Sequence, residues 1–272
     1  MSKNLGCPRV KQEAVAQSYR ISIMAVKLAP VLAEFVALLL FVFICCGCAT
    51  GVAGEAGWVQ QVSLTFGLCI TVLAYTIGHY SGGQINGAVT VGLMAAGELE
   101  PLQGVCNIFG QLCGSLVGAG LLSAMVKKES DLTGGLGSNG VGSGFSNSQA
   151  LLGEIVMTFV LMYVVLETAV SKTNNKGDFA PIAIGFAVYL GHVVLIPIDG
   201  CSINPTRSFG PAVVATVQDR GSKHFEDFWV FVLGPVIGAL LAVAHFKAMT
   251  KAAPEVPPED TKIELPSRDE EA

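Results

Sequence analysis

Residues 81–90 read Ser-Gly-Gly-Gln-Ile-Asn-Gly-Ala-Val-Thr, and residues 200–212 read Gly-Cys-Ser-Ile-Asn-Pro-Thr-Arg-Ser-Phe-Gly-Pro-Ala. Each segment places one asparagine, Asn86 or Asn204, at the start of a short apolar stretch in a chain rich in membrane spans. The first backbone N–H groups of a helix have no intrahelical partner, and hydrocarbon offers none. The two segments therefore predict two short helices that begin at mid-membrane. We expect their starts to meet at a pore and to present both asparagine side chains to what passes through.

The composition is that of a polytopic membrane protein. Of the 272 residues, 51% are hydrophobic and only 14% are charged, whereas soluble domains carry about 25% charged residues. Six of the eight cysteines lie in apolar stretches, where cysteine packs as a small hydrophobe, and Cys45-Cys46-x-Cys48 is too tight for ordinary zinc spacing. We expect no disulfide framework, metal site or cofactor. No catalytic set or phosphate-binding loop is evident, so we expect neither an enzyme nor a nucleic-acid partner.

The apolar segments predict an all-α membrane protein, because a spanning helix needs about 20 mostly apolar residues. Two further apolar segments, 86–97 and 204–216, are too short to span and follow the second and fifth spans. We expect them to form re-entrant half-helices. The six predicted spans are 29–49, 60–80, 103–126, 150–170, 179–197 and 228–248.

The two halves of the chain repeat one pattern. Glu34 and Glu154 lie 120 positions apart near the start of the first and fourth spans, and Asn86 and Asn204 lie 118 apart. Three spans per half is an odd number, so the second half is inserted upside down, and inverted repeats place their shared site near the bilayer midplane. We predict three regions: an N-terminal segment 1–28, a channel domain 29–248 with repeats at about 29–126 and 150–248, and a disordered acidic tail 249–272.

Lysine and arginine residues predict that both termini are cytoplasmic. The connection around residues 50–59, on the predicted outer side, has no lysine or arginine. Lys127 and Lys128 also lie on the predicted outer side and count against the assignment. The glycine- and serine-rich segment 134–144 predicts a flexible outer loop. No retention or sorting address is obvious, and we favour the plasma membrane over an internal membrane. The residues that set the orientation are Lys3, Arg9, Lys11, Arg20, Lys27, Lys172, Lys176, Lys247 and Lys251.

Two kinds of buried charge stand out in the predicted spans. Glu34 and Glu154 are carboxylates inside apolar helices, where they act as proton relays or accept the unpaired N–H groups of the loops that lead into the half-helices. Their symmetric placement favours the structural role. Arg207 lies three positions after Asn204 in an apolar setting, so we predict that it faces the lumen and bonds carbonyls just upstream.

The asparagines suit a water path. Each carboxamide oxygen can cap its helix while its amide hydrogens face the lumen. Two such donors, together with two positive helix ends at the same depth, would hold a water oxygen and repel cations and protons.

With these motifs, the repeated glutamate and the order of six spans, the chain resembles the aquaporin (major intrinsic protein) family over about residues 30–248. The resemblance implies a homotetramer with one pore per subunit. It also implies a constriction formed by Phe66, His192, Cys201 and Arg207, the pattern of water-selective members. Ser208 follows Arg207, where glycerol-conducting relatives tend to have aspartate.

We therefore predict a passive water channel that is driven by osmotic gradients, excludes ions and protons, and is inhibited by mercury at Cys201. Three alternatives stay open: a broader pore for glycerol, ammonia or hydrogen peroxide, a non-conducting adhesive or structural membrane protein, and a proton-coupled carrier.

The chain departs from the family's paired Asn-Pro-Ala motifs in both halves. It reads Asn86-Gly87-Ala88 in the first and Asn204-Pro205-Thr206 in the second. Proline at the first helical position preorganises a helix start, so Gly87 predicts a looser first half-helix. Thr206 adds a methyl and a hydroxyl where the tips of the half-helices should touch. We expect the filter to survive, and the effect on rate and on other permeants stays open.

Overall fold

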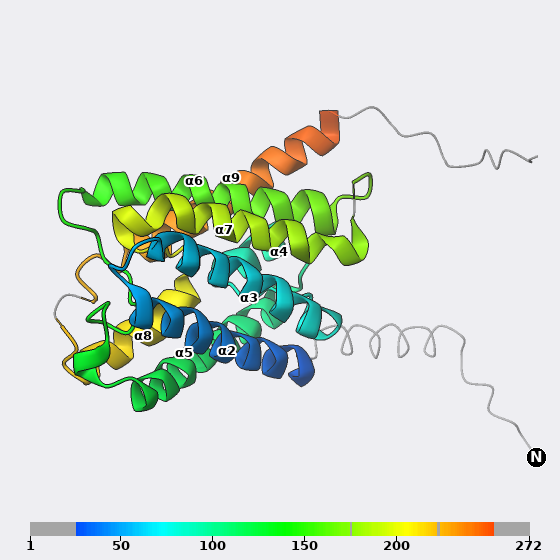
Figure 1. Ribbon diagram of the computed structural model, residues 1–272. Coiled ribbons are helices and arrows are strands. Elements are labelled where there is room, and N and C mark those ends of the chain that lie inside the picture. Colours follow the sequence, from blue (N-terminus) through cyan, green and yellow to red (C-terminus); the bar gives the residue numbers. More distant parts are fainter. Residues whose placement is uncertain (1–25, 175, 222–223, 253–272) are drawn as a thin grey trace, which may run out of the picture.

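A computed structural model describes residues 26–174, 176–221 and 224–252, and these ranges contain helices and no strand. Figure 1 shows the long helices as one bundle, with the first and last described residues at the same end of it. A π-helical turn η2 (Leu166–Val170) continues α6, and two short 3-10 turns, η1 (Lys128–Ser130) and η3 (Gly177–Phe179), lie in connections. The α-helices are α2 (Leu28–Val52), α3 (Trp58–Ser81), α4 (Gly87–Ala96), α5 (Pro101–Met125), α6 (Asn147–Val165), α7 (Ala180–Asp199), α8 (Pro205–Val217) and α9 (Val230–Ala252).

The predicted fold is confirmed. Six helices are long and apolar enough to cross a membrane, and two short helices, α4 and α8, follow the second and fifth of them. The bounds differ from the predicted ones by a few residues. The largest difference is at the end of the chain, where α9 continues to Ala252, past the predicted boundary at 248. Most of the predicted N-terminal segment and acidic tail lies outside the described residues.

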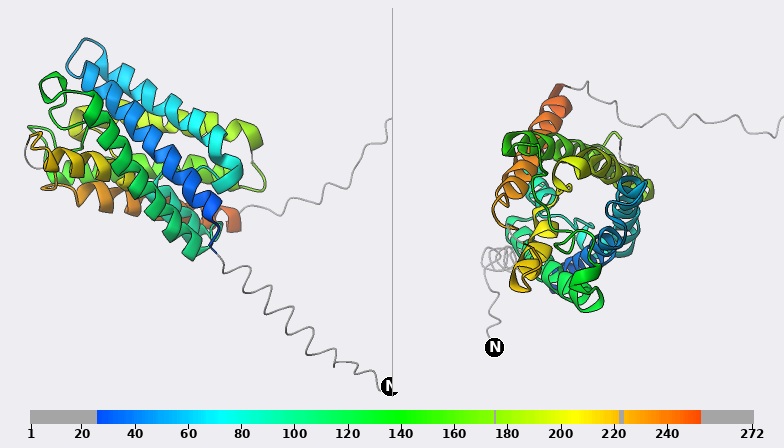
Figure 2. Two further views of the ribbon diagram at one scale, coloured as in Figure 1. Left: turned by 90° about the horizontal axis from the view of Figure 1, so that it is seen from below. Right: turned by 60° about the vertical axis from the view of Figure 1, so that its left-hand side comes forward.

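The two repeats interlock. In the first repeat α2 packs against α5 and α3, and in the second α6 packs against α9 and α7, while α3 meets α7 where the repeats join. Each short helix packs on the last long helix of the opposite repeat, α4 on α9 and α8 on α5. Figure 2, in its right-hand view, looks toward the end at which α6 begins and shows the long helices as a ring. This interlocking brings the starts of α4 and α8 together inside the bundle.

Glycines allow the closest helix contacts at equivalent places in the two repeats. A Cβ atom on Gly114 of α5 would collide with the backbone carbonyl of Phe35 on α2, and one on Gly238 of α9 would collide with that of Ile155 on α6. Phe35 and Ile155 are themselves 120 positions apart. Small residues let helices approach closely in lipid, and here they let each glutamate-bearing helix, α2 or α6, pack closely on the last long helix of its own repeat.

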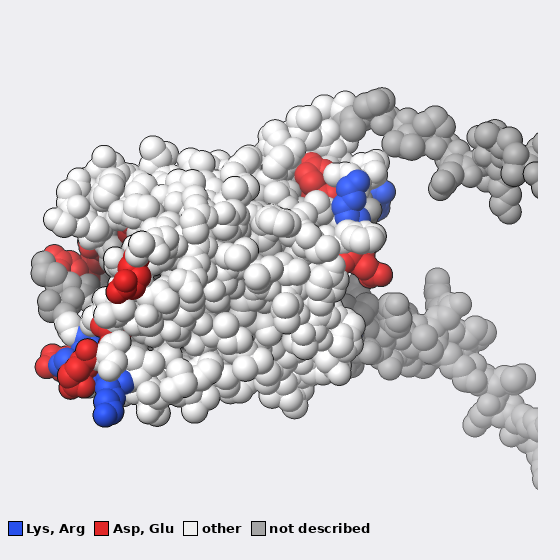
Figure 3. All heavy atoms as spheres, in the orientation of Figure 1, with Lys and Arg blue, Asp and Glu red and all other residues white. Residues whose placement is uncertain are grey.

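The surface is that of an integral, multi-pass membrane protein. Charged side chains gather at the two ends of the bundle and leave a broad uncharged band between them (Figure 3). Large apolar side chains are exposed on the long helices, which suits contact with lipid. Examples are Leu68, Phe109, Phe186, Leu190 and Leu241.

The connection between α5 and α6 differs from the flexible loop predicted at 134–144. Leu136 is fully buried and Asn139 is 5% exposed. Asp131 accepts hydrogen bonds from the backbone N–H groups of Thr133 (3.0 Å) and Leu136 (2.7 Å), and Gly142 donates to the carbonyl of Ile198 on α7 (2.8 Å). Three of the six glycines here take positive φ, such as 68° at residue 137, and a Cβ atom on Gly142 would collide with the Ile198 carbonyl.

Candidate functional site

The two buried carboxylates hold the segments that lead into the short helices. Each segment contains an isoleucine with left-handed backbone angles, Ile85 (φ 52°) or Ile203 (φ 43°). The N–H groups of these segments therefore take no part in the hydrogen-bond pattern of a helix. Buried backbone donors need acceptors, and Glu34 on α2 and Glu154 on α6 supply them, each fully buried. The bonds run to Glu34 from Gln84 N (2.9 Å) and Ile85 N (2.7 Å), and to Glu154 from Ser202 N (2.7 Å) and Ile203 N (2.6 Å).

Asn86 and Asn204 stand at the N-caps of α4 and α8. The side-chain oxygen of Asn86 accepts from the backbone N–H of Ala88 at 2.8 Å, and that of Asn204 accepts from the N–H of Arg207 at 3.1 Å. Both caps have extended backbone angles, as N-cap residues usually do. Asparagine at each position therefore supplies a side-chain acceptor to a helix start inside the bundle.

The same two side chains are bonded crosswise. The amide nitrogen of Asn86 donates to the carbonyl of Ile203, and that of Asn204 donates to the carbonyl of Ile85, both at 2.8 Å. Each amide carries two hydrogens, so these bonds engage one and leave the second for another acceptor. The structure thus brings together two asparagines that lie 118 positions apart in the sequence.

Residues next to the asparagines form the contact between the helix starts. Pro205 is the first residue of α8, the position that proline favours. Ala88 is fully buried in the first turn of α4. Gly87 and Thr206, the two departures from the family motif, touch each other: the Gly87 N–H donates to the Thr206 hydroxyl at 3.1 Å.

A second group of side chains lies on one side of this centre. The rings of Phe66 on α3 and His192 on α7 stack with centroids 4.0 Å apart, and the guanidinium carbon of Arg207 lies 5.2 Å from the Phe66 centroid. Cys201 is fully buried in the segment before α8, and its backbone N–H donates to the Asp199 carboxylate at 2.9 Å. The predicted constriction residues thus come from α3, α7, α8 and the loop before it.

Arg207 finds its partners in a different segment from the one predicted. Its Nη1 donates to the carbonyl of Gly137 and to the side-chain oxygen of Asn139, both at 2.8 Å. These acceptors belong to the connection between α5 and α6, not to the loop just upstream of Arg207. Asn139 also accepts from the Ser208 hydroxyl at 2.7 Å. Sequence reasoning missed both acceptors, because a glycine- and serine-rich segment carries no local signal for a contact 70 residues away.

Two buried polar atoms in this group have no hydrogen-bond partner among the described residues. His192 Nδ1 contacts the Val188 carbonyl at 2.9 Å, and because a carbonyl only accepts, Nδ1 carries the hydrogen. In a neutral ring Nε2 is then an acceptor. Among the described residues, neither His192 Nε2 nor Arg207 Nε has a hydrogen-bond partner, although both are buried. His192 thus holds one unpaired acceptor and Arg207 one unpaired donor.

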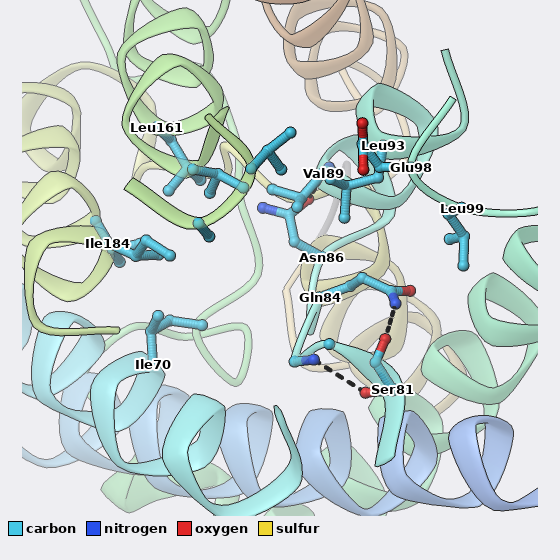
Figure 4. Close-up of a pocket in the computed structure, with 16 residues that line it drawn as sticks. Ile70, Ser81, Gln84, Asn86, Val89, Leu93, Glu98, Leu99, Leu161 and Ile184 are labelled. Atoms are coloured by element: carbon cyan, nitrogen blue, oxygen red, sulfur yellow. Dashed lines mark hydrogen bonds between the residues drawn. The ribbon is translucent and has the colours of Figure 1, made fainter. Parts of the chain in front are cut away.

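Cavities reach this site from both ends of the bundle. The predicted orientation makes one the inner cavity, of about 260 Å³, into which Asn86, Ile70 and Leu161 point (Figure 4). The outer cavity, of about 370 Å³, ends at Phe66 and Arg207. His192 connects the two linings, because its ring stacks on Phe66 while its Nδ1 bonds Val188, which lines the inner cavity.

This arrangement defines a helical membrane channel built from two inverted repeats. The profile of the major intrinsic protein family matches residues 22–246, and the chain belongs to that family. The resemblance predicted from the sequence is thereby confirmed.

Named relatives cover most of the chain. Aquaporin-1 of Sus scrofa is 41% identical over 223 residues, which are 78% of this chain and 79% of that protein. Probable aquaporin PIP2-6 of Oryza sativa subsp. japonica is 39% identical over 233 residues, covering 82% and 81%. Among solved structures, the aquaglyceroporin from Plasmodium falciparum matches with a TM-score of 0.75 and 18% identity, covering 83% of this chain and 99% of that one. At that identity the likeness shows the fold alone.

Proposed function

We propose that this channel passes water down osmotic gradients and excludes ions, protons and larger polyols. The observation that carries the proposal is the stacked pair Phe66–His192, with Arg207 5.2 Å from the Phe66 ring. We expect the two bulky rings, with a guanidinium fixed by two hydrogen bonds, to leave room for water and not for a larger molecule. A polyol could neither fit there nor recover the hydrogen bonds it loses on leaving water.

Water suits the open polar atoms of this constriction. Water can satisfy the His192 Nε2 acceptor and the Arg207 Nε donor in turn, because it both donates and accepts. Phe66 adds an apolar wall that offers no competing partner. The guanidinium charge raises the energy of a cation at the same place, so the constriction selects by size and by charge.

The asparagine pair is the second element of the proposed mechanism. Asn86 and Asn204 each keep one amide hydrogen beyond their crosswise bonds. Two donors and two helix N-termini would bind a water oxygen and turn its hydrogens toward both ends of the path. A cation or a proton meets positive potential there, and the oriented water cannot pass a proton along the file. Glu34 and Glu154 serve the filter indirectly, as acceptors that fix the re-entrant segments.

The proposal includes topology and assembly. The connection after α6, with Lys172 and Lys176, lies at the same end of the bundle as the end of α9, with Lys247 and Lys251 (Figure 1). We assign this end, and with it both termini, to the cytoplasm, and we place the channel in the plasma membrane. We also propose a homotetramer with one pore per subunit, as the aquaporin resemblance implies.

Stopped-flow light scattering of reconstituted vesicles tests the proposed function. We expect fast shrinkage in a gradient of an impermeant osmolyte and no protein-dependent glycerol uptake. Glycerol uptake at a comparable rate would mean a broader pore. Water permeability equal to that of empty vesicles would mean a non-conducting protein, and saturable uptake driven by a pH gradient would mean a carrier.

Mercury provides a second test at Cys201. The cysteine lies in the segment before α8, three residues before Asn204, so we expect a bound mercurial to block the constriction. We expect mercury to inhibit the wild type and to leave Cys201→Ser conducting. Inhibition that persists in Cys201→Ser would place the reactive thiol elsewhere, and Cys69→Ser, which replaces another buried cysteine, is the matched control.

A further inference from the structure

The two departures from the family motif form one contact between the repeats. Gly87 opens α4 and Thr206 is the second residue of α8. The Gly87 N–H lies 3.1 Å from the Thr206 hydroxyl oxygen, and a Cβ atom on residue 87 would lie 2.9 Å from the Thr206 methyl carbon. Any side chain at position 87 would therefore crowd the threonine.

The contact also gives a backbone N–H at the start of α4 a hydrogen-bond acceptor. The first N–H groups of a helix lack intrahelical acceptors. Proline removes one such donor because it has no N–H, whereas Gly87 keeps it. The Thr206 hydroxyl accepts it, with the Asn204 side-chain oxygen further away at 3.4 Å. Glycine at 87 and threonine at 206 thus suit each other in shape and in hydrogen bonding.

The Thr206 hydroxyl continues into a chain of side-chain bonds. It has one hydrogen, which it can share between the side-chain oxygens of Asn204 (2.8 Å) and Gln111 (3.1 Å). Gln111 on α5 presents its oxygen because its amide nitrogen donates to Glu34 at 2.8 Å. The chain therefore runs from the first-repeat carboxylate, through Gln111 and Thr206, to the second-repeat asparagine.

The Thr206 hydroxyl acts together with two backbone groups to set which way the Asn204 carboxamide points. Its oxygen accepts from the Thr206 hydroxyl at 2.8 Å and from the Arg207 N–H at 3.1 Å. A flipped amide would set its nitrogen against the Arg207 N–H and lose its donation to Ile85. Asn86 differs, because its oxygen accepts from two N–H groups of its own helix, those of Ala88 and Val89.

We infer that Thr206 is a positioning residue that orients Asn204 at the pore centre, and that Gly87 is the partner it requires. The inference rests on the proposed water path. It also reverses the expectation that Gly87 merely loosens the first half-helix: installing the family's proline at 87 alone should harm this channel, because its ring would meet the Thr206 methyl and its nitrogen has no hydrogen to donate.

Three variants in reconstituted full-length protein test the pairing, namely Gly87→Pro, Thr206→Ala and the double variant Gly87→Pro/Thr206→Ala, and two more, Thr206→Val and Thr206→Ser, test the hydroxyl. The readouts are melting temperature, water permeability per folded channel and proton leak per folded channel. We expect Gly87→Pro to lower water permeability at least about threefold and the double variant to return to within about twofold of wild type, since residues in contact are not additive. Additive effects in both melting temperature and permeability would overturn the pairing.

Thr206→Val isolates the hydroxyl, because valine keeps the shape and loses the hydrogen bonds. We expect the ratio of proton leak to water permeability to rise at least about threefold, with Thr206→Ser matching the wild type. A Thr206→Val ratio equal to that of the wild type would overturn the positioning role. If the wild type itself passed no water, the proposed function would fail, yet the melting-temperature cycle would still report whether Gly87 and Thr206 are coupled.

Discussion

Changing either buried carboxylate to an amide, Glu34→Gln or Glu154→Gln, tests how the re-entrant segments are held. Glu154 accepts one backbone N–H on each oxygen, at 2.7 and 2.6 Å. Glutamine has the same shape but keeps one acceptor and turns an NH2 group toward the other N–H. Loss of one hydrogen bond to a charged acceptor destabilises the fold by about 1.5–3 kcal/mol.

Glu34 should be at least as sensitive. Each of its oxygens accepts two donors, including the Ser81 hydroxyl at 2.6 Å and the Gln111 amide at 2.8 Å. In a domain of this size 1 kcal/mol shifts the melting temperature by about 2–4 °C, so each variant should melt about 3–12 °C below wild type. Thermal unfolding of the purified protein measures this shift, and water permeability of the folded fraction is measured beside it.

Glu100→Gln is the matched control for both variants. Glu100 also accepts a backbone N–H, that of Gln103 at 2.8 Å, but at an exposed helix start. Its amide can turn its oxygen to the same donor, so the change should stay within about 0.5 kcal/mol. If Glu154→Gln had the melting temperature of the wild type and instead abolished a pH-dependent current, the carboxylate would be a proton relay and not a structural acceptor.

Two further predictions concern the anchor of the constriction and the helix contacts. Asn139→Ala removes an acceptor from the buried Arg207 guanidinium and should raise glycerol or cation permeability relative to water at least about threefold, since a lost bond to a charged group costs about 1.5–3 kcal/mol. The control Asn147→Ala loses an amide–carboxylate bond away from the pore and should leave this permeability ratio unchanged. Equal ratios in both variants would contradict the anchoring of Arg207 by Asn139. Gly114→Ala should destabilise the fold by about 1–3 kcal/mol because its Cβ meets the α2 backbone. The control Gly120→Ala, which has open space around its Cβ, should melt at or above the wild-type temperature. Equal melting temperatures of the two variants would argue against the close approach of α2 and α5.

The architecture could be predicted from the sequence because the signals for it are either local or repeated. Twenty-residue apolar runs predict spans, and the spacing of Glu34–Glu154 and Asn86–Asn204 reveals the repeat. The short helices were placed within a few residues, since an asparagine before an apolar stretch is both a cap and a start signal.

What the sequence did not yield depends on contacts between distant segments. Asn139 gives no local sign that it accepts a bond from Arg207, because glycine-rich composition is as typical of tight turns as of mobile loops. Gly87 and Thr206 were each visible as departures from the family motif. Their pairing was not, because it arises only when inverted repeats place residues 119 positions apart in contact.

In the proposed channel, two half-helices meet and hold water between their asparagines. A density map of the protein in lipid, at a resolution that shows ordered water, would reveal this water itself. We expect a water within hydrogen-bond distance of the side-chain nitrogens of both Asn86 and Asn204, in a file that continues past His192 to Arg207. Asparagines far apart, or an Arg207 side chain turned to lipid, would contradict it.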